Sequence, residues 1–459
     1  MSVDLHLDVR GPRVLAGLTG ALREAVRTGR LAPGSRLPGS RSLAVDLGVA
    51  RNTVVAAYAE LVDEGWLIAR QGAGTHVPYR HVPASQVPSG DTRPRYDLRV
   101  GRPDTSSFPR AEWVRATQRA MDRASHDAFG YPSPFGRMEL RRAVADYLAR
   151  ARGVHADPSR VVICSGASHG VQVLAVALRA RQVGAVAVEA YGLPVHRELF
   201  TKAGLRTPPL SLDRHGARTD RLGGVGAVML TPAHQFPTGV ALHPERRAAA
   251  VEWARSTGGL IIEDDYDGEF RYDRTPVGAL QGLGPEQVVY LGTASKAIAP
   301  GLRLGWLVVP DGVAEDVGRA LGDISVTSSL DQLVLAELLE SGGYDKHVRS
   351  MRLRYRRRRD ELVETGIRLS GISAGLHALI ELPRHTETTV LDNCVTERLA
   401  VYGLDAFRHP ATPKDREALV VGFGTPTRSG WPGALEVLSR VLSHVSPSRH
   451  HRHDRPDDE

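Results

Sequence analysis

The sequence of 459 residues predicts an α/β protein in two parts, a small helical unit followed by a large domain of strands and helices. Three observations support this prediction. Apolar runs at 161–164, 260–262 and 288–291 each end in polar residues, as buried strands do at the edge of a sheet. Residues 14–62 repeat apolar positions at helical spacing before a glycine-rich stretch at residues 65–77. Residues 80–95, between these parts, are rich in proline, serine and polar side chains.

The first predicted domain, residues 1–79, contains three helices and a hairpin. One helix carries Val14, Leu18, Leu22 and Val26 on one face. A second helix ends at the turn containing Gly48, and a third buries Val54, Tyr58, Leu61 and Val62. A glycine-rich hairpin follows at residues 65–77. Elements in this order are typical of a winged helix-turn-helix, a fold that binds DNA.

A linker and a tail flank the large predicted domain, which spans residues 96–445. Residues 80–95 predict an extended linker, long enough to let the N-terminal domain lie on a partner subunit. Residues 446–459 mix His450, His451 and His453 with charged side chains, a composition typical of disorder. A metal site formed by these histidines is the alternative.

The stretch at residues 290–305 combines one lysine with groups that bind phosphate. A strand end delivers Thr293, Ser295 and Lys296 into a turn, and Pro300 and Gly301 bring Arg303 back toward them. Such a lysine can hold an aldehyde cofactor as a Schiff base, while hydroxyls and a guanidinium bind its phosphate. The alternative is an ordinary loop with a surface lysine.

Carboxylates cluster at residues 263–269, where another apolar run ends. They would repel one another without compensation, so we expect a cation or a protonated ring nitrogen nearby. A magnesium or calcium site is the alternative. The spacing is not that of a calcium loop, however, and no phosphate loop ending in Lys-Ser or Lys-Thr accompanies it.

Together, these two segments resemble the fold-type I, aspartate-aminotransferase-like enzymes that use pyridoxal 5'-phosphate (PLP). The resemblance covers residues 96–445 and implies a mostly parallel sheet with flanking helices and a smaller C-terminal α+β part. Lys296 matches the Schiff-base lysine, and Asp264 matches the acid that bonds the pyridinium nitrogen. Tyr266 matches the residue that bonds the phenolic oxygen of the ring. The matching phosphate ligands are Ser295 and Arg303, with Thr293 beside them.

Other segments match the same enzymes in the expected order. The phosphate loop matches Gly166, Ala167 and Ser168, at the start of a predicted helix whose N-terminus favours an anion. The resemblance implies that Tyr191 is the aromatic residue at the cofactor and that Tyr131 reaches the phosphate of the neighbouring subunit. Phe236 stands where many aminotransferases have asparagine, so one hydrogen bond to the ring oxygen is lost.

The N-terminal domain resembles the GntR-type DNA-binding domain. Joined to an aminotransferase-like domain, it resembles the MocR-family transcription regulators. The resemblance implies DNA contacts from two regions: Arg41, Arg51, Asn52 and Thr53 in the helices, and Gly72, Gly74, Thr75 and His76 in the wing. Gly39 and Ala50 stand where the family usually has serine, and a lost capping hydroxyl at Ala50 costs about 1 kcal/mol and one phosphate contact.

Composition agrees with a DNA-binding protein of the cytoplasm. The formal charge of +7 favours a polyanionic partner. Cys164 and Cys394 are the only cysteines, which excludes a disulfide framework and suits a reducing compartment. No membrane span or secretion leader is recognisable, so we expect a cytoplasmic, nucleoid-associated protein. The arginine-rich residues 352–359 predict the exposed, charged face of a long helix.

The resemblance predicts a PLP-dependent DNA-binding transcription regulator. Its aminotransferase-like domain would sense an amine, an amino acid or PLP itself, its operator would be double-stranded DNA, and it would form a head-to-tail, domain-swapped homodimer. The alternative is an active PLP-dependent aminotransferase with a fused DNA-binding head. The arginine that clamps a substrate carboxylate would fall near Val420 and is missing, which weakens this alternative, although Arg416 or Arg408 could substitute.

Overall fold

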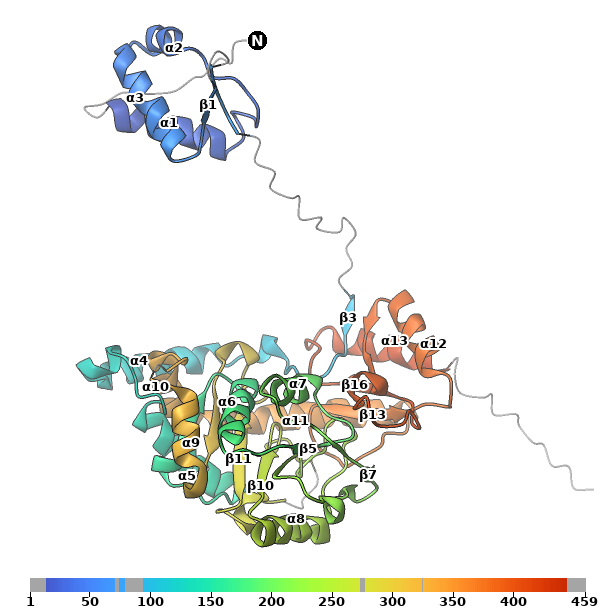
Figure 1. The fold of residues 1–459 in the computed structure, drawn as a ribbon. Coiled ribbons are helices and arrows are strands. Elements are labelled where there is room, and N and C mark those ends of the chain that lie inside the picture. The colour runs from blue at the N-terminus through green and yellow to red at the C-terminus, as the bar shows by residue number, and fades with distance from the viewer. Residues whose placement is uncertain (1–13, 71–73, 79–93, 273–276, 324, 444–459) are drawn as a thin grey trace, which may run out of the picture. The chain divides into compact units, whose positions relative to one another are not determined.

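The computed structural model describes residues 14–70, 74–78, 94–272, 277–323 and 325–443. The chain divides into two compact units, Met1–Thr92 and Arg93–Glu459, shown in Figure 1. Gly72, most of the predicted linker and the histidines of the tail lie outside the described residues.

The first unit contains the predicted three helices and hairpin. Its elements are α1 (Val14–Arg27), α2 (Ser40–Leu47), α3 (Arg51–Asp63) and the antiparallel pair β1 (Ile68–Arg70) and β2 (Gly74–His76). Gly48 ends α2 at a φ of 64°, a conformation that glycine adopts without strain, and this allows the sharp turn into α3. Leu18, Leu22, Val54 and Leu61 are buried in one core. The winged helix-turn-helix prediction is confirmed, although Val62 is only half-buried.

The second unit is built on a sheet of seven strands. In spatial order these are β4 (Val161–Cys164), β12 (Gly305–Val308), β11 (Val288–Thr293), β10 (Leu260–Asp264), β9 (Ala227–Leu230), β5 (Val186–Glu189) and β6 (Pro209–Leu210). From β11 to β6 all neighbours are parallel, whereas β12 is antiparallel to both of its neighbours. The sheet is therefore mostly parallel, as predicted.

Helices cover both faces of this sheet (Figure 1). They are α4 (Arg110–Arg123), α5 (Met138–Arg152), α6 (Ala167–Ala180), α7 (Pro194–Lys202), α8 (Pro244–Thr257), α9 (Asp311–Leu321) and α10 (Ser329–Glu340). Alternate strand residues serve opposite faces: Ile163 and Tyr290 pack in one core with α5 and α10, whereas Val162 and Val289 pack in another with α6 and α9. Because both faces are covered, the strands are apolar at nearly every position.

A smaller C-terminal part follows. It contains α11 (Gly343–Glu364), β13 (His377–Glu381), α12 (Glu387–Thr396), β14 (Leu399–Ala400), β15 (Tyr402–Gly403), β16 (Ala418–Gly422) and α13 (Trp431–Ser443). Strands β13, β16 and β15 form an antiparallel sheet. Strand β3 (Tyr96–Asp97), at the start of the unit, pairs with β14. The predicted α+β part is thus confirmed, and it includes the first strand of the large unit.

Short elements complete the described chain. Strands β7 (Leu212–Asp213) and β8 (Gly216–Ala217) form a hairpin, and 3-10 helices lie at Thr105–Ser107, His126–Phe129, Pro158–Arg160, Thr219–Arg221, Gln281–Leu283, Pro300–Leu302 and Leu404–Phe407. Within the described ranges, no helix is both long and apolar enough to cross a membrane.

Helix α11 contains the arginine-rich residues 352–359, so the predicted long helix is confirmed. One arginine departs from the predicted exposed face. Arg358 is buried, lies 3.2 Å from the Asp104 carboxylate and donates to the carbonyl of Phe423. Because α11 is packed on one side, a run of charged residues longer than one turn places at least one of them on the buried face. The buried guanidinium of Arg358 is tolerated there because it has these two partners.

Candidate functional site

A cavity of about 500 Å³ collects most of the side chains that the sequence singles out in the large unit. Its lining includes Ala167, Ser168, Asp264, Tyr266, Thr293, Ser295, Lys296 and Arg303. Asp264 is the last residue of β10, and Thr293 is the last residue of the neighbouring β11. Because these strands are parallel, their carboxyl ends meet at one edge of the sheet, where ligands bind in such folds.

Lys296 is the amine of this cavity. Its Nζ donates a hydrogen bond of 2.7 Å to the carbonyl of Gly101. Burial lowers the pKa of Lys296, although the charges of Asp264 and Asp267 oppose this shift. A lysine with a lowered pKa has more of the neutral amine, which is the form that attacks an aldehyde.

Asp264 supplies a carboxylate with one free oxygen. Its Oδ1 is buried and has no hydrogen-bond partner among the described residues, and its Oδ2 lies 3.6 Å from Nδ1 of His196. Burial raises the pKa of Asp264 to about 7, and the nearby Lys296 partly offsets this effect. A protonated ring nitrogen would satisfy both the free oxygen and the charge, so the donor set fits the pyridinium of PLP.

The neighbouring carboxylates each have a partner within the protein. Asp265 lies 2.6 Å from Nε of Arg152, and Asp267 lies 2.9 Å from Nδ1 of His234. Glu263 accepts two backbone N–H bonds. The compensation expected from the sequence is therefore divided among several groups. Among the described residues, Oδ1 of Asp264 and Oδ1 of Asp265 have no hydrogen-bond partner, and of these two residues Asp264 lines the cavity.

An anion cradle lies beside the lysine. Gly166 precedes the N-terminus of α6 at a φ of 75°, and a Cβ added there would lie 3.1 Å from the Arg303 guanidinium. Thr293 Oγ1 donates to Ser295 Oγ at 2.9 Å, which holds both hydroxyls at the cavity. A helix N-terminus, two hydroxyls and a guanidinium together suit a phosphate group.

Besides Gly166, two predicted cofactor residues, Tyr191 and Tyr131, do not line this cavity. Tyr191 is buried, and its hydroxyl lies 3.4 Å from an Asp415 carboxylate oxygen; Leu193 lines the cavity instead. Tyr131 is fully exposed in the single chain. Phe236 lines the cavity and offers no polar atom, in agreement with the missing hydrogen bond inferred from the sequence.

The arginines considered as carboxylate clamps are engaged elsewhere. Arg416 pairs with Glu381 at 2.5 Å, and Arg408 pairs with Asp405 at 2.6 Å. Val420 is buried in β16. Arg197 of α7, which the sequence did not single out, lines the cavity, and its side chain makes no hydrogen bond or ion pair with any residue that the structure describes.

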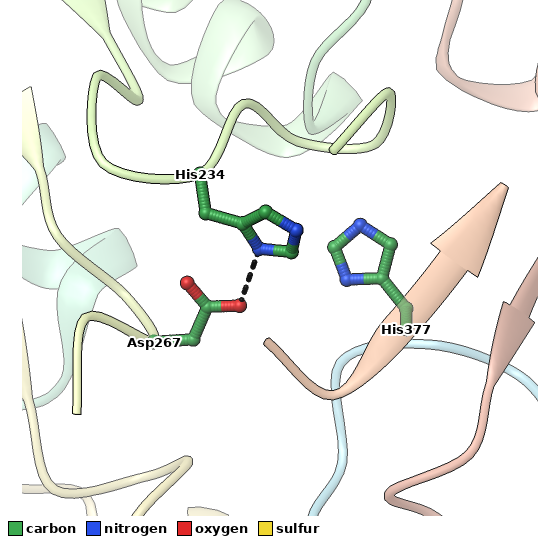
Figure 2. A group of neighbouring side chains, drawn as sticks. All are labelled: His234, Asp267 and His377. Carbon is green, nitrogen blue, oxygen red and sulfur yellow. Dashed lines mark hydrogen bonds and ion pairs between the residues drawn. The ribbon is translucent and has the colours of Figure 1, made fainter. Parts of the chain in front are cut away.

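Three histidines of the large unit come from separate elements, and no sequence motif indicated them: His196, His234 and His377. Figure 2 shows the group formed by His234, Asp267 and His377, whose candidate ligand atoms lie within 4.8 Å of one another. The group has the composition of a metal site. One ring nitrogen of each histidine already has a partner within the protein, however: His234 Nδ1 bonds Asp267, and His377 Nε2 lies 3.2 Å from the carbonyl of Pro237.

The predicted DNA contacts of the first unit lie at helix starts and in the hairpin. Arg41, Arg51 and Asn52 are exposed, and Thr53 is half-buried. In the wing, Gly74 is exposed, whereas Thr75 and His76 are half-buried. Ala50 precedes α3 in an extended conformation without a side-chain cap, as its residue type implies. Exposed cations at a helix N-terminus are groups that bind DNA phosphates.

Comparison with known proteins agrees with this arrangement. Residues 95–416 match the aminotransferase class I and II family, and residues 16–77 match the gntR family of bacterial regulatory proteins. The chain is 32% identical over 441 residues to the HTH-type pyridoxine biosynthesis transcriptional regulator PdxR of Corynebacterium glutamicum, which covers 93% of this chain and 95% of that protein. It is 31% identical over 369 residues to the probable rhizopine catabolism regulatory protein MocR of Rhizobium meliloti, with 74% and 75% covered.

Solved structures share the fold of the large unit. An archaeal alanine:glyoxylate aminotransferase matches with a TM-score of 0.69 at 22% identity, covering 76% of this chain and 91% of that chain. The kynurenine aminotransferase of Pyrococcus horikoshii matches with a TM-score of 0.68 at 23% identity, covering 77% and 91%. With a gntR-type unit ahead of an aminotransferase domain, and with regulators of the same architecture as relatives, the chain belongs to the MocR family of DNA-binding transcription regulators.

Proposed function

We propose that this regulator binds PLP at Lys296 and uses the loaded cavity to sense an amine, an amino acid or PLP itself. The observation that carries the proposal is the free, buried Oδ1 of Asp264 in a cavity that also holds Lys296 and an anion cradle. A carboxylate left without a partner at such a place calls for a cationic ligand group. The aminotransferase class I and II family is PLP-dependent, which agrees with this assignment.

Each side chain has a defined task toward the cofactor. Lys296 is the attachment point, because its lowered pKa favours the nucleophilic amine. Asp264 holds the pyridinium nitrogen, and Tyr266 is the partner of the ring oxygen. The N-terminus of α6, Thr293, Ser295 and Arg303 hold the phosphate. PLP supplies an electron sink and an aldehyde when it is bound.

If the effector is an amine, Arg197 favours one that also carries an anionic group. Arg416 and Arg408 are paired within the protein, so they are not free to clamp a carboxylate. Arg197 lines the cavity without such a partner among the described residues. The rest of the lining is largely apolar, with Leu193 and Phe407 among its members, and suits an apolar body between the two charged ends.

Regulation follows from a difference in affinity. An effector changes DNA binding only if it binds one arrangement of the protein more tightly than another. We also propose a head-to-tail homodimer in which the N-terminal unit of each chain lies on the large unit of the partner chain. The exposure of Tyr131, which matches a residue that reaches the phosphate of a neighbouring subunit, supports contact between the two large units, and the exchange of the N-terminal units rests on the resemblance alone.

Reconstitution tests the proposal. The purified protein is incubated with PLP, reduced with borohydride and digested, and mass spectrometry then locates the adduct. We expect a visible absorbance band and an adduct on Lys296, and neither in the Lys296→Ala variant. A protein that stays colourless, or an adduct spread over surface lysines, contradicts the proposal.

A second experiment separates the sensor from an active aminotransferase. The loaded protein receives a panel of amino acids together with a keto acid. A change in absorbance without sustained production of a new amino acid supports the sensor, and continued turnover supports the enzyme. Binding of DNA next to the gene of this protein, measured with PLP alone and with PLP plus each amine, shows whether the cofactor or the amine is the signal.

A further inference from the structure

The hydroxyl of Tyr266 contacts side chains to which no sequence motif gave a role. It donates to the main-chain carbonyl of His234 at 3.1 Å, and it lies 3.1 Å from Nδ1 of the same histidine. Nδ1 in turn lies 2.9 Å from Oδ2 of Asp267, as Figure 2 shows. Asp267 and His234 are almost fully buried, with side-chain exposures of 1% and 3%. The three residues form a continuous chain of short contacts that ends at the cavity.

The direction of the protons follows from the acceptors. A carboxylate only accepts, so Nδ1 of His234 carries a hydrogen toward Asp267. The oxygen of Tyr266 lies beside the same N–H and can accept from it. The hydrogen of Tyr266 is then the donor of the chain, and in this structure it is directed at the main-chain carbonyl of His234. Asp267 thereby fixes the tautomer of His234, as a carboxylate does for a histidine at a working site.

The surrounding packing leaves the side chains of Tyr266, His234 and Asp267 little room to move. A Cβ added at Gly375 would lie 2.5 Å from both His234 Nδ1 and Asp267 Oδ2, so the backbone of Gly375 closes over their contact. His377 stacks against Tyr266 and lies 4.9 Å from the His234 ring between ring centroids. Phe236 meets the rings of both Tyr266 and His377 edge-on. Its side chain offers no polar atom to the hydroxyl, so the orientation of the Tyr266 hydroxyl depends on His234 and Asp267.

We propose that Asp267 and His234 are positioning residues that hold the Tyr266 hydroxyl for the ring oxygen of the cofactor. The proposal rests on the proposed function, because it requires PLP at Lys296. It assigns to the segment at residues 231–239 a task that its sequence did not reveal: His234 supports the remaining partner of the ring oxygen, where Phe236 provides none.

The expected signature is spectroscopic. A hydrogen bond to the ring oxygen stabilises its negative charge, and this matters most when the Schiff-base nitrogen has lost the proton that it shares with that oxygen. Loosening Tyr266 therefore makes the nitrogen hold its proton to higher pH. The titratable groups around Tyr266 are Glu189, His234, Asp264, Asp267, Lys296 and His377. All variants compared keep Asp264 and Glu189. A difference in titration midpoint between variants therefore reports on the hydrogen bonds that His234 makes with Tyr266 and Asp267.

The experiment is a pH titration of the visible absorbance of the PLP-loaded full-length protein without effector. For His234→Ala we expect the midpoint to rise by about one pH unit, the size of effect that loss of one hydrogen bond to a charged group produces. His234→Asn should restore the midpoint toward wild type, because its side-chain amide nitrogen lies near the place of Nδ1. His409→Asn is the matched control: His409 is another buried histidine of the large unit, it does not line the cavity, and within the described residues it has no bond to Tyr266, so its midpoint should stay with wild type.

Each outcome is decisive. If wild type shows no visible band, the proposed function fails before this inference is reached. If wild type is loaded and the midpoints of His234→Ala and wild type coincide, or if His234→Asn behaves like His234→Ala, the positioning role is overturned. If His377→Gln shifts as far as His234→Ala and the apoprotein binds one Zn²⁺ that either substitution abolishes, the group is a metal site and the proposal is wrong.

Discussion

The guanidinium of Arg152 lies 2.6 Å from the carboxylate of Asp265, and the two side chains are only 7% and 1% exposed. Asp265 follows Asp264 directly, so this ion pair fixes the backbone that presents the free carboxylate to the cavity. Tyr290 of β11 donates a second hydrogen bond of 2.8 Å to the same oxygen. The pair therefore links the end of α5 to two strands beneath the candidate cofactor site.

Loss of one partner of this pair should be strongly destabilising. We expect Asp265→Ala to lower the free energy of unfolding by about 3–5 kcal/mol, because a buried guanidinium is left without its counter-charge. Urea denaturation of the full-length protein measures the change. As control, Arg319→Ala removes an exposed partner of Glu315 and should cost less than about 1 kcal/mol. Equal losses for the two variants would contradict this account of the buried pair.

Asp264 should make the stability of the apoprotein depend on pH. Burial raises its pKa to about 7 from an ordinary value of 3.8, so the folded state keeps a proton that the unfolded state has released. The resulting stabilisation is complete below the unfolded pKa and is lost as pH rises through 7, at about 1.4 kcal/mol per pH unit between these limits. Asp264→Asn should flatten the decline of the melting temperature between pH 5 and 7. Glu189, Glu263 and Glu269 are raised to about 7 as well, so part of the slope should remain. An unchanged slope in Asp264→Asn would show that this carboxyl is ionised in the folded apoprotein.

A serine at position 50 should strengthen the start of α3. Ala50 has the extended backbone of a cap residue but no oxygen for the free N–H groups, and serine there is worth about 1 kcal/mol. Hydrogen exchange of α3 amides in the full-length protein measures the change, and slower exchange is expected for Ala50→Ser. The same substitution at the exposed Ala56, inside α3, is the control and should not slow exchange. Similar effects at both positions would exclude capping as the cause.

Arg51 should contribute an electrostatic contact with DNA. We expect Arg51→Ala to weaken binding to double-stranded DNA and to reduce the slope of log affinity against log salt concentration by about one. Fluorescence anisotropy at several salt concentrations measures both. Arg30→Ala changes an exposed arginine of the same unit outside the predicted contacts and should leave the slope unaltered. If the two variants lose affinity equally, only the total charge of the unit matters.

Arg197 should discriminate between effectors. Arg197→Met is expected to weaken the response of the PLP-loaded protein to amines that carry a carboxylate by roughly tenfold or more, the loss expected for one charge-assisted hydrogen bond, and to spare the same amines without it. Titration of the visible absorbance gives the apparent affinities. Arg416→Met is the control, because Arg416 is paired with Glu381 and does not line the cavity. Loss of response to both kinds of amine in Arg197→Met would indicate a general disturbance of α7.

The sequence predicts those parts of the site that depend on neighbouring residues. Lys296 follows a strand end and lies within a few residues of two hydroxyls, and Asp264 ends an apolar run, so short motifs reveal both. The contacts of Arg152 with Asp265 and of His234 with Tyr266 join residues that are 113 and 32 positions apart. Only the folded sheet brings such partners together, and no pattern in one segment predicts them.

The direction of side chains outside helices and strands is the other feature that the sequence does not predict. Tyr191 lies two residues after β5, where the alternation of a strand no longer determines which way a side chain points. Its hydroxyl turns to Asp415, and Leu193 lines the cavity. The burial of Arg358 could not be predicted for a related reason: the face of α11 that is buried depends on Asp104, which lies far away in the sequence.

The pairing of β3 with β14 attaches the first strand of the large unit to its C-terminal part. Backbone contacts join Leu98 to Ala400 and Gly422 as well, so the chain arriving from the N-terminal unit is fastened to the C-terminal part and not to the central sheet. In the sensor that we propose, a ligand-induced movement of this C-terminal part also moves the point at which the incoming chain is attached.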